Sequence, residues 1–467
     1  MAVRGTANAT EPPQGIGMAV KRNGWRWTTL ALALALGSGV RAEDGTPRMA
    51  SKPGGESAAN LNAQLKVIGI ALQTADAATL TQLYQTTTDP IVRVWTAMAL
   101  ERVHFNLDAA SADAKTCENA LFDNRPGLAL SCGQFRVGNL NLAGRAADAM
   151  QAERELIARY RGHHVEPRLD NMQAFLDARA DVPPLSYEVP AGDVTLKVED
   201  NPTHAQSKVF ANGREEPSTI PGIKVAANGH QLIAMLDTGA SNFVVGQEEA
   251  VRLGVTPLDK QGHVNGWLAK NVPIQTGVLE TLAFGGITLH HVPVTVVPDP
   301  IVLIGGNLLA PLGTLKISST ALQIYGKESV APTCDTPMLI GSGPWGDGMR
   351  LYPQLLVNDT PQPVMLDTGA YLYLIGTRAA LDEVTTLHRD KTSMRDIGGR
   401  HAFANTQDAK VKLTIAGQPF DIAFSVYTDA DNPKHPITLG AGALRDMDFL
   451  LDFRHQRQCF LLHPNLR

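Results

Sequence analysis

The sequence lacks most of the features that would place it in a specialised class. Its 467 residues include only 6% aromatic and 19% charged side chains, and the formal net charge is −5. It therefore has no strongly basic face for nucleic acid. It also has no zinc-type Cys and His spacing, no His-Glu-x-x-His, no Gly-x-Ser-x-Gly and no lysine-bearing phosphate loop, so we expect neither a metal nor a cofactor. Its 44% hydrophobic content suffices for the cores of two or three domains.

One short apolar run is placed like a targeting segment. Basic residues from Lys21 onward precede the run at residues 30–36, and Val40-Arg41-Ala42 offers small residues for cleavage. We predict that residues 1–42 form a signal peptide, with Met18 as an alternative start. The run is too short to span a bilayer, so we expect no stable membrane anchor and export to the periplasm or beyond.

The chain has four cysteines, an even number that suits an exported protein with disulfides. We expect Cys117 to pair with Cys132, which would join neighbouring helices. Cys334 and Cys459 are expected to tie the start of the last part of the chain to its final strand. Buried free thiols are the alternative.

Changes in pattern divide the remaining chain. Residues 43–57 are rich in Gly, Pro and Ser and predict a disordered leader. Residues 58–180 show a period near 3.6 and predict a helical domain. Residues 181–217 predict a linker with strands and a turn at Asn212-Gly213, and 218–330 and 331–467 predict two β regions. The expected helices are Ala58–Thr74, Ala77–Gln85, Pro90–Phe105, Ala109–Asp123, Gly127–Leu140, Ala143–Arg161 and Pro167–Arg179.

One stretch of the helical domain, Leu128–Met150, resembles a tetratricopeptide (TPR) helix-turn-helix. Two or three degenerate TPR-like repeats and a plain helical bundle both fit this pattern. Neither architecture carries chemistry by itself. We therefore expect the domain to hold a protein partner or to brace the rest of the chain.

The two β regions repeat one hexapeptide, Met-Leu-Asp-Thr-Gly-Ala, at Met235–Ala240 and Met365–Ala370. In each copy an apolar run delivers an aspartate to the end of an expected strand, where a charge must be paired or functional. Other sequence features recur at similar distances from the two hexapeptides over some seventy residues, which predicts a duplicated β lobe. The matched features are the turns Asn228-Gly229 and Asn358-Asp359, the hairpins Phe284–Leu289 and Ile415–Phe420, and the apolar runs closing on Gly305 and Gly440.

Each β region resembles a subunit of the retropepsin-like aspartic proteases, and the pair resembles a single-chain, two-lobed enzyme of that kind. The segment Ile304–Ile317 follows the Gly-x-Asn-Leu-Leu pattern of this family, and Leu439–Leu444 is a looser counterpart. The resemblance implies two pseudo-symmetric all-β acid-protease lobes from about Ile220 onward. With the α-helical TPR-like domain that the periodicity predicts before them, we expect an α+β multidomain chain.

The resemblance also implies a catalytic role for Asp237 and Asp367. Two close carboxylates that share one proton can take a proton from water while giving one to the substrate. The supporting residues implied by the family are Thr238 and Thr368, which would lock the two loops together, Gly239 and Gly369, which permit the tight turns, and Ala240 and Ala370.

Ala240 and Ala370 lead to an expectation about pH. A hydroxyl at this position can donate a hydrogen bond to the carboxylate and lower its pKa, whereas alanine cannot. We therefore expect an optimum between mild acid and neutral pH.

Substrate in this family binds as extended peptide beneath flap hairpins. Gly266 and Trp267 lie where the flap of the first lobe is expected, and Gly398 and Gly399 where that of the second is expected. Trp267 either covers a substrate side chain or packs at the base of the flap.

The sequence thus predicts an exported aspartic endopeptidase that acts on peptide or protein substrates. It is expected to be a monomer in which the two lobes pair within one chain. One alternative is a catalytically silent peptide-binding or scaffold protein. The other is an enzyme that pairs each lobe with a second chain.

Overall fold

The computed structural model describes residues 55–200, 208–211, 214–217, 220–264, 271–377, 388–395, 401–427 and 437–464. The expected signal peptide and most of the expected leader lie outside this range. Residues 55–57, the end of that leader, belong to the first helix. Among the described residues, no helix combines the length and apolar character needed to cross a membrane.

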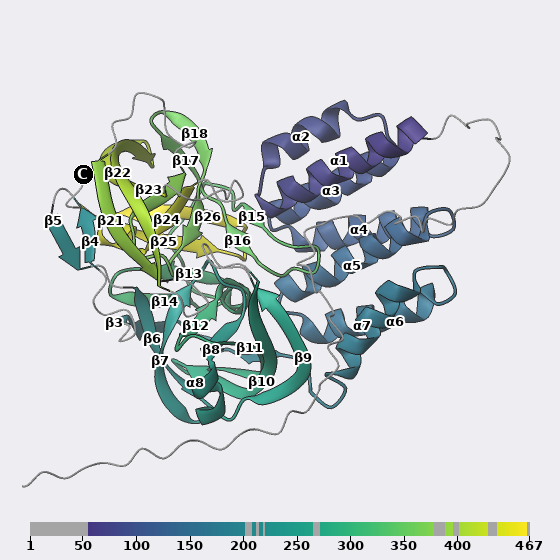
Figure 1. Cartoon of the computed structure of the whole chain (residues 1–467), viewed down its shortest axis with the longest axis horizontal. Helices are drawn as coiled ribbons and strands as arrows, with labels where there is room; N and C mark the ends of the chain where they lie inside the picture. The colour runs from purple at the N-terminus through teal and green to yellow at the C-terminus, as the bar shows by residue number, and fades with distance from the viewer. Residues whose placement is uncertain are drawn as a thin grey trace, which may run out of the picture.

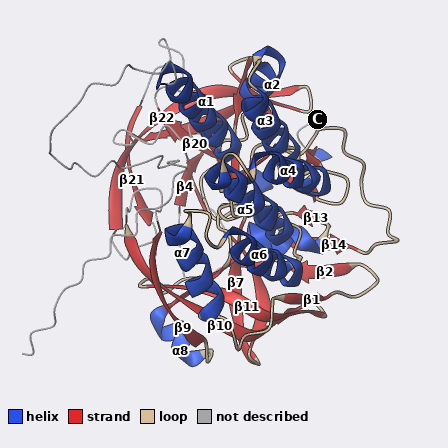
Figure 2. Cartoon of the chain, turned by 90° about the vertical axis from the view of Figure 1, so that its right-hand side faces the viewer, coloured by secondary structure: helices blue, strands red, loops and turns tan. Residues whose placement is uncertain are grey.

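Helices occupy the described chain up to residue 177, as the sequence predicts. Figure 2 shows them in front of the strands of the two lobes. The seven helices of this part are α1 (Gly55–Gln73), α2 (Ala77–Thr86), α3 (Pro90–Val103), α4 (Leu107–Leu121), α5 (Pro126–Leu142), α6 (Ala146–Tyr160) and α7 (Glu166–Asp177).

Side-chain caps explain why two of these helices begin where they do. Asp76 accepts the N–H of Thr79 at 2.9 Å at the start of α2. Asp89 accepts the N–H of Ile91 at 2.8 Å, and Pro90 fills the first position of α3, where its missing N–H has no cost. Each aspartate satisfies amides that lack a partner within the helix.

The helical core is completed by the second lobe. Successive helices pack against one another around buried residues such as Leu80, and Leu339, Tyr352 and Met365 join the same apolar cluster. Burial of this shared surface joins the helices to the lobe, because separating them would expose apolar area to water. Met365 begins the hexapeptide that carries Asp367.

The first lobe is built mainly from strands that follow residue 220. Its mixed sheet has the order β1-β11-β8-β12-β7-β6-β10-β9, with β3 beside β6. The bounds are β1 (Ser186–Glu188), β3 (Glu199–Asp200), β6 (Pro221–Ala227), β7 (His230–Asp237), β8 (Phe243–Gly246), β9 (Thr256–Val264), β10 (Val272–Phe284), β11 (Ile287–Val297) and β12 (Val302–Gly305), with α8 (Gln247–Arg252) after β8.

The second lobe repeats the central pairings of the first. In each lobe the aspartate strand pairs in parallel with a short strand, which pairs antiparallel with the strand after the turn. The bounds are β15 (Ile340–Gly341), β16 (Arg350–Leu351), β17 (Gln354–Val357), β18 (Thr360–Pro363), β19 (Met365–Asp367), β20 (Leu374–Thr377), β21 (His388–Arg395), β22 (His401–Ile415), β23 (Gln418–Tyr427) and β24 (Ile437–Gly440).

The turns expected before the aspartate strands are duplicated in detail. Asn228 and Asn358 adopt φ of 47° and 49°, a left-handed conformation that asparagine tolerates. The side-chain oxygen of Asn228 accepts the N–H of Thr281 at 2.9 Å, and that of Asn358 accepts the N–H of Lys412 at 3.0 Å. The same residue type therefore fixes the same turn in both lobes.

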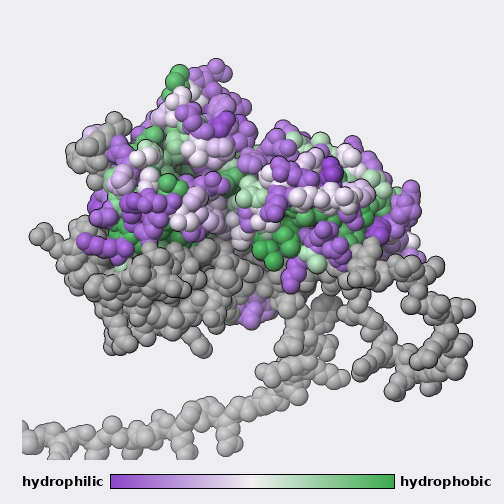
Figure 3. All heavy atoms as spheres, turned by 90° about the horizontal axis from the view of Figure 1, so that it is seen from above, coloured by the Kyte–Doolittle hydropathy of each residue, from purple (hydrophilic) through white to green (hydrophobic). Residues whose placement is uncertain are grey.

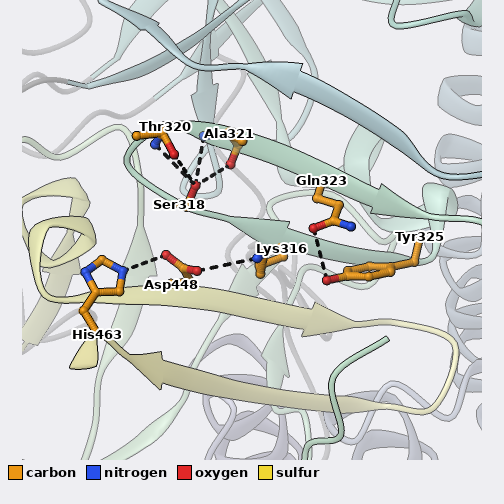
Figure 4. Close-up of polar contacts among 8 residues, drawn as sticks. All are labelled: Lys316, Ser318, Thr320, Ala321, Gln323, Tyr325, Asp448 and His463. Atoms are coloured by element: carbon orange, nitrogen blue, oxygen red, sulfur yellow. Dashed lines mark hydrogen bonds and ion pairs between the residues drawn. The ribbon is translucent and has the colours of Figure 1, made fainter. Parts of the chain in front are cut away.

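A separate sheet joins the lobes, in the order β2-β14-β13-β25-β26. The side chain of Asp448 links strands of the two lobes, as Figure 4 shows. It contacts His463 Nε2 at 2.9 Å and Lys316 Nζ at 3.7 Å. The bounds are β2 (Val194–Lys197), β13 (Thr314–Ile317), β14 (Ala321–Tyr325), β25 (Met447–Asp452) and β26 (Arg457–Leu462), with α9 (Gly306–Leu309), η1 (Ala310–Leu312) and η3 (Ala441–Arg445) leading into it.

The segment expected to be a linker supplies strands to both sheets. β2 pairs with β14 in the joining sheet, and β1 pairs with β11 in the first lobe. Two further strands, β4 (Lys208–Ala211) and β5 (Arg214–Pro217), pair antiparallel around the expected turn, whose own residues lie outside the described range. The linker is thus part of the fold of the lobes.

Both expected disulfides are present. Cys117 and Cys132 join α4 to α5, and Cys334 and Cys459 join the segment after β14 to β26. On the face shown in Figure 3, hydrophobic residues of the described chain are interspersed with hydrophilic ones. Val67 and Ile70 on α1 are among the exposed apolar side chains.

Candidate active site

The two repeated aspartates end matching strands. Asp237 closes β7 opposite Gly305 of β12, and Asp367 closes β19 opposite Gly440 of β24. A Cβ atom at Gly305 would lie 2.4 Å from the carbonyl carbon of Ser241, so only glycine permits the short strand to approach the aspartate loop this closely. Each short strand therefore braces the loop that carries its aspartate.

The two aspartate loops face each other across the lobe boundary. A Cβ atom at Gly239 would lie 2.5 Å from Cγ of Asp367, and one at Gly369 would lie 2.6 Å from Cγ of Asp237. Each carboxyl group therefore lies against the glycine of the other loop. A side chain at either glycine would displace the opposite carboxyl group.

Four hydrogen bonds lock the loops together through Thr238 and Thr368, which are 1% and 0% exposed. The N–H of each threonine donates to the hydroxyl of the other at 3.1 Å. The hydroxyl of Thr238 donates to the carbonyl of Leu366 at 2.9 Å, and that of Thr368 donates to the carbonyl of Leu236 at 2.7 Å. The lock fixes the distance between the two loops.

Backbone amides hold each carboxyl group in its own loop. Oδ1 of Asp237 accepts the N–H of Gly239 at 2.8 Å and that of Ala240 at 3.0 Å. Oδ1 of Asp367 accepts the N–H of Gly369 at 2.9 Å. These bonds favour the ionised carboxylate.

Burial works against that ionisation. It raises the pKa of Asp237 well above the usual value, and the charge of Asp367 raises it further. Burial also raises the pKa of Asp367, while the positive charge of Arg350 lowers the pKa of both groups. Such a pair holds one proton between its members at pH values where an isolated aspartate is ionised.

Arg350 was not identified from the sequence. It lies 17 residues before Asp367, and only the pairing of the two-residue strand β16 with β19 brings it back to the site. A strand of this length has no recognisable alternation, so the sequence carries no signal for it.

The two tyrosines after the second aspartate loop point to different places. Tyr371 packs on an apolar cluster of the first lobe that includes Ala240 and Met235. Tyr373 is 5% exposed within the main core of the lobes. Tyr371 therefore links the second lobe to the first beside Asp237, whereas Tyr373 is a core residue.

The expected flap residues Gly266, Trp267, Gly398 and Gly399 lie outside the described residues. The hairpins that flank them are described: Val264 pairs with Val272 between β9 and β10, and Arg395 pairs with His401 between β21 and β22. Among the described residues, no group of His, Cys, Asp or Glu is arranged to hold a metal ion.

Comparison with known proteins bears on the first lobe. Residues 223–308 match the family model described as aspartyl protease. This stretch runs from the strand before Asp237 to the segment that braces it, and the match supports an aspartic protease fold. No curated protein matches the chain.

Several solved structures resemble parts of the chain at low identity. A retropepsin-like aspartic protease from Rickettsia conorii is 18% identical, with a TM-score of 0.20, over 31% of this chain and 96% of that one. Basic 7S globulin from soybean is 14% identical, with a TM-score of 0.34, over 58% and 95%. An aspartic proteinase from Irpex lacteus is 11% identical, with a TM-score of 0.36, over 58% and 98%.

Proposed function

We propose that this chain is an exported aspartic endopeptidase in which Asp237 and Asp367 form one active site between two lobes. The observation that carries the proposal is the reciprocal threonine lock, which sets two carboxyl groups of raised pKa face to face. Structural turns do not need a second carboxyl group at a mirrored position. The family match of residues 223–308 supports peptidase activity in general.

In the proposed mechanism the pair begins with one proton. The ionised carboxylate takes a proton from a water molecule as the water oxygen attacks the scissile carbonyl carbon. The protonated carboxyl group gives its proton to the carbonyl oxygen, which forms a neutral tetrahedral intermediate. As the C–N bond breaks, the carboxyl group that now holds the proton gives it to the leaving amine, and the other carboxylate takes a proton from one hydroxyl of the intermediate. The intermediate becomes a carboxylic acid, and the pair again holds one proton.

The proposal also places the enzyme outside the cytoplasm as a monomer. The two disulfides support export, because such bonds persist in oxidising compartments. The bonds between Thr238 and Thr368 join residues of one chain and support intramolecular pairing of the lobes. The proposed TPR-like helical region braces the second lobe, a role that the shared apolar cluster supports.

The test is cleavage of a peptide library by the protein lacking residues 1–42. Asp237→Asn and Asp367→Asn are each expected to lose at least about a thousandfold in kcat/KM, because one member of the pair can no longer ionise. Asp359→Asn is the matched control, since Asp359 lies in an exposed turn beside Lys412. Cleavage that survives either dyad substitution contradicts the proposal.

The alternatives give different results in the same assay. A binding protein retains library peptides without cleaving them, and the asparagine variants bind as well as the original. An enzyme that needs a second chain shows activity that rises with the square of protein concentration. The proposed monomer shows activity proportional to concentration.

A further inference from the structure

One loop of the second lobe leaves the lobe and lies on the helices. The β15–β16 loop, Ser342–Met349, extends from its two strands toward the helical region (Figure 1). The N–H of Ser342 donates to the carbonyl of Leu72 in α1 at 3.3 Å. The side chain of Asn141 in α5 donates to the carbonyl of Trp345 at 3.3 Å. The loop therefore contacts two helices that are distant in the sequence.

A buried arginine of α3 clamps this loop. Arg102 is 0% exposed and donates to the carbonyl of Gly343 at 2.8 Å and to that of Pro344 at 3.1 Å. Its other nitrogens donate to the side chain of Asn139 at 2.6 Å and to the carbonyl of Phe135. The planar guanidinium thus joins α3, α5 and the loop, a geometry that lysine cannot reproduce.

The loop and α5 touch backbone to backbone. A Cβ atom at Gly138 would lie 2.2 Å from the carbonyl oxygen of Pro344 and 2.7 Å from the nitrogen of Gly346. A Cβ atom at Gly346 would lie 2.3 Å from the carbonyl oxygen of Gly138. Because these are main-chain atoms, they cannot make room for a Cβ atom by a side-chain rotation. Any side chain at Gly138 must displace the loop.

The opposite face of the loop contacts the support of the first aspartate loop. The side chain of Asn307 donates to the carbonyl of Gly346 at 2.7 Å. Met349 is fully buried, and its Cε lies 3.2 Å from the position of a Cβ atom on Gly306. The N–H of Gly306 donates to the carbonyl of Ala240 at 2.7 Å. The loop is therefore held between the helices and the bracing segment of the first lobe.

The loop ends at the aspartate pair. Strands β16 and β19 run antiparallel with Leu351 opposite Leu366, and this register sets Arg350, the residue before Leu351, alongside Asp367, the residue after Leu366. Residues directly opposite in such a ladder share a face of the sheet, with Cβ atoms roughly 5 Å apart. The position of Arg350 thus depends on where the loop holds the start of β16.

We propose that the helical region acts as a positioning element for the active site: by clamping the β15–β16 loop it keeps the positive charge of Arg350 beside Asp367. This inference rests on the proposed peptidase function, but one of its tests, the titration of the carboxyl groups, requires no cleavage. Arg350 is a positioning residue here. It acts through the carboxyl pair and touches no reacting atom.

Among the described residues, the charges that act on the pair come from the pair itself and from Arg350. The charge of Asp367 raises the pKa of Asp237, and the charge of Arg350 lowers the pKa of both carboxyl groups. At the far end of the loop, burial lowers the pKa of Arg102 to about 9, and the charge of Asp347 opposes this change. Arg102 is therefore positively charged at neutral pH. No change in its protonation is required.

The direct test removes the charge of Arg350 in the otherwise intact chain. Arg350→Gln is expected to move both limbs of the pH profile of kcat/KM upward by about one pH unit, since a nearby cation no longer favours ionisation. Arg350→Lys keeps the charge and is expected to restore most of the original profile. The same shift is expected in the titration of ¹³C-labelled aspartate carboxyl groups, which requires no cleavage.

A second test acts on the loop from the helices. Gly138→Ala is expected to displace the loop and shift the pH profile in the same direction as Arg350→Gln. Gly127→Ala in the same helix is the matched control, because its Cβ atom would meet only Val165 at 4.0 Å. If Gly138→Ala does not fold, Trp345→Ala removes a loop side chain that packs on the helical core.

The double variant Gly138→Ala/Arg350→Gln separates the two routes. If the loop acts through Arg350, its profile matches that of Arg350→Gln alone, whereas additive shifts overturn the inference. An unchanged carboxyl titration in Arg350→Gln also overturns it, even if peptides are cleaved. Failure of the proposed function looks different: either the original chain cleaves no peptide, or the asparagine variants of the pair keep cleaving, whatever the titration shows.

Discussion

Replacing Thr238 with valine removes one hydroxyl from the lock between the aspartate loops and changes little else in shape. The carbonyl of Leu366 then loses its donor at 2.9 Å, and the N–H of Thr368 loses its acceptor at 3.1 Å. Each buried group left without a partner costs about 1–3 kcal/mol. We therefore expect the free energy of unfolding to fall by about 2–6 kcal/mol.

Urea denaturation of the variant and of the original chain measures this loss, and cleavage of a model peptide measures its effect on the site. Thr238→Ser keeps both hydrogen bonds and loses one methyl group, so it is expected to cost only about 1 kcal/mol. Thr295→Val, at a half-buried position of β11, controls for the change of residue type. An unchanged urea midpoint and unchanged activity in Thr238→Val would refute the reasoning.

Three further outcomes follow from the structure. Ala240→Ser or Ala370→Ser adds a donor to a carboxylate and is expected to lower the acidic limb of the pH profile of kcat/KM by about half a pH unit. Thr438→Val removes a buried hydroxyl that has no partner among the described residues. It is expected to raise the free energy of unfolding, measured in urea, by about 1 kcal/mol. His463→Gln is expected to lower stability at pH 5.5 but hardly at pH 8.5. The hydrogen bond to Asp448 raises the pKa of His463, so the stabilisation, up to about 1 kcal/mol, is present below the unfolded pKa and lost as pH rises through the folded one.

The helices and the central pairings of the lobes could be predicted because their signals are local. Asp89-Pro90 marks the start of α3 by capping and by a fixed φ, both properties of adjacent residues. The turns at Asn228 and Asn358 are equally local, and their equal spacing from the hexapeptides predicts matched strands. Duplication adds a second source of information, since each lobe confirms the pattern of the other.

The facing arrangement of Asp237 and Asp367 could also be expected, whereas Arg350 and the joining sheet could not. Two aspartates at mirrored positions suggest a shared site by chemistry alone. The approach of Arg350 depends on the path of the β15–β16 loop, which is fixed by Arg102 of α3 and Gly138 of α5. Contacts between residues so far apart leave no periodic trace in the sequence.

The two copies of the hexapeptide show how context alone produces asymmetry. Met235 packs in a small cluster with Tyr371 in the first lobe. Met365, its counterpart, joins the helical core with Leu339 and Tyr352. The residue type and local strand are the same, but the second lobe has the helices as its neighbour. The helical region therefore covers an apolar face that the second lobe cannot cover by itself.

If the helices cover this face, Leu339→Gln has opposite effects in the full chain and in a chain that lacks the helices. A chain beginning at residue 181 exposes Leu339, Tyr352 and Met365 and is expected to aggregate. Leu339→Gln is expected to improve its solubility, because it places a polar group on the exposed face. In the full chain the same substitution buries an amide among apolar side chains. The free energy of unfolding, measured in urea, is therefore expected to fall by about 2–4 kcal/mol. Equal effects in both forms, measured by sedimentation and urea denaturation, would mean that the helices do not cover this face.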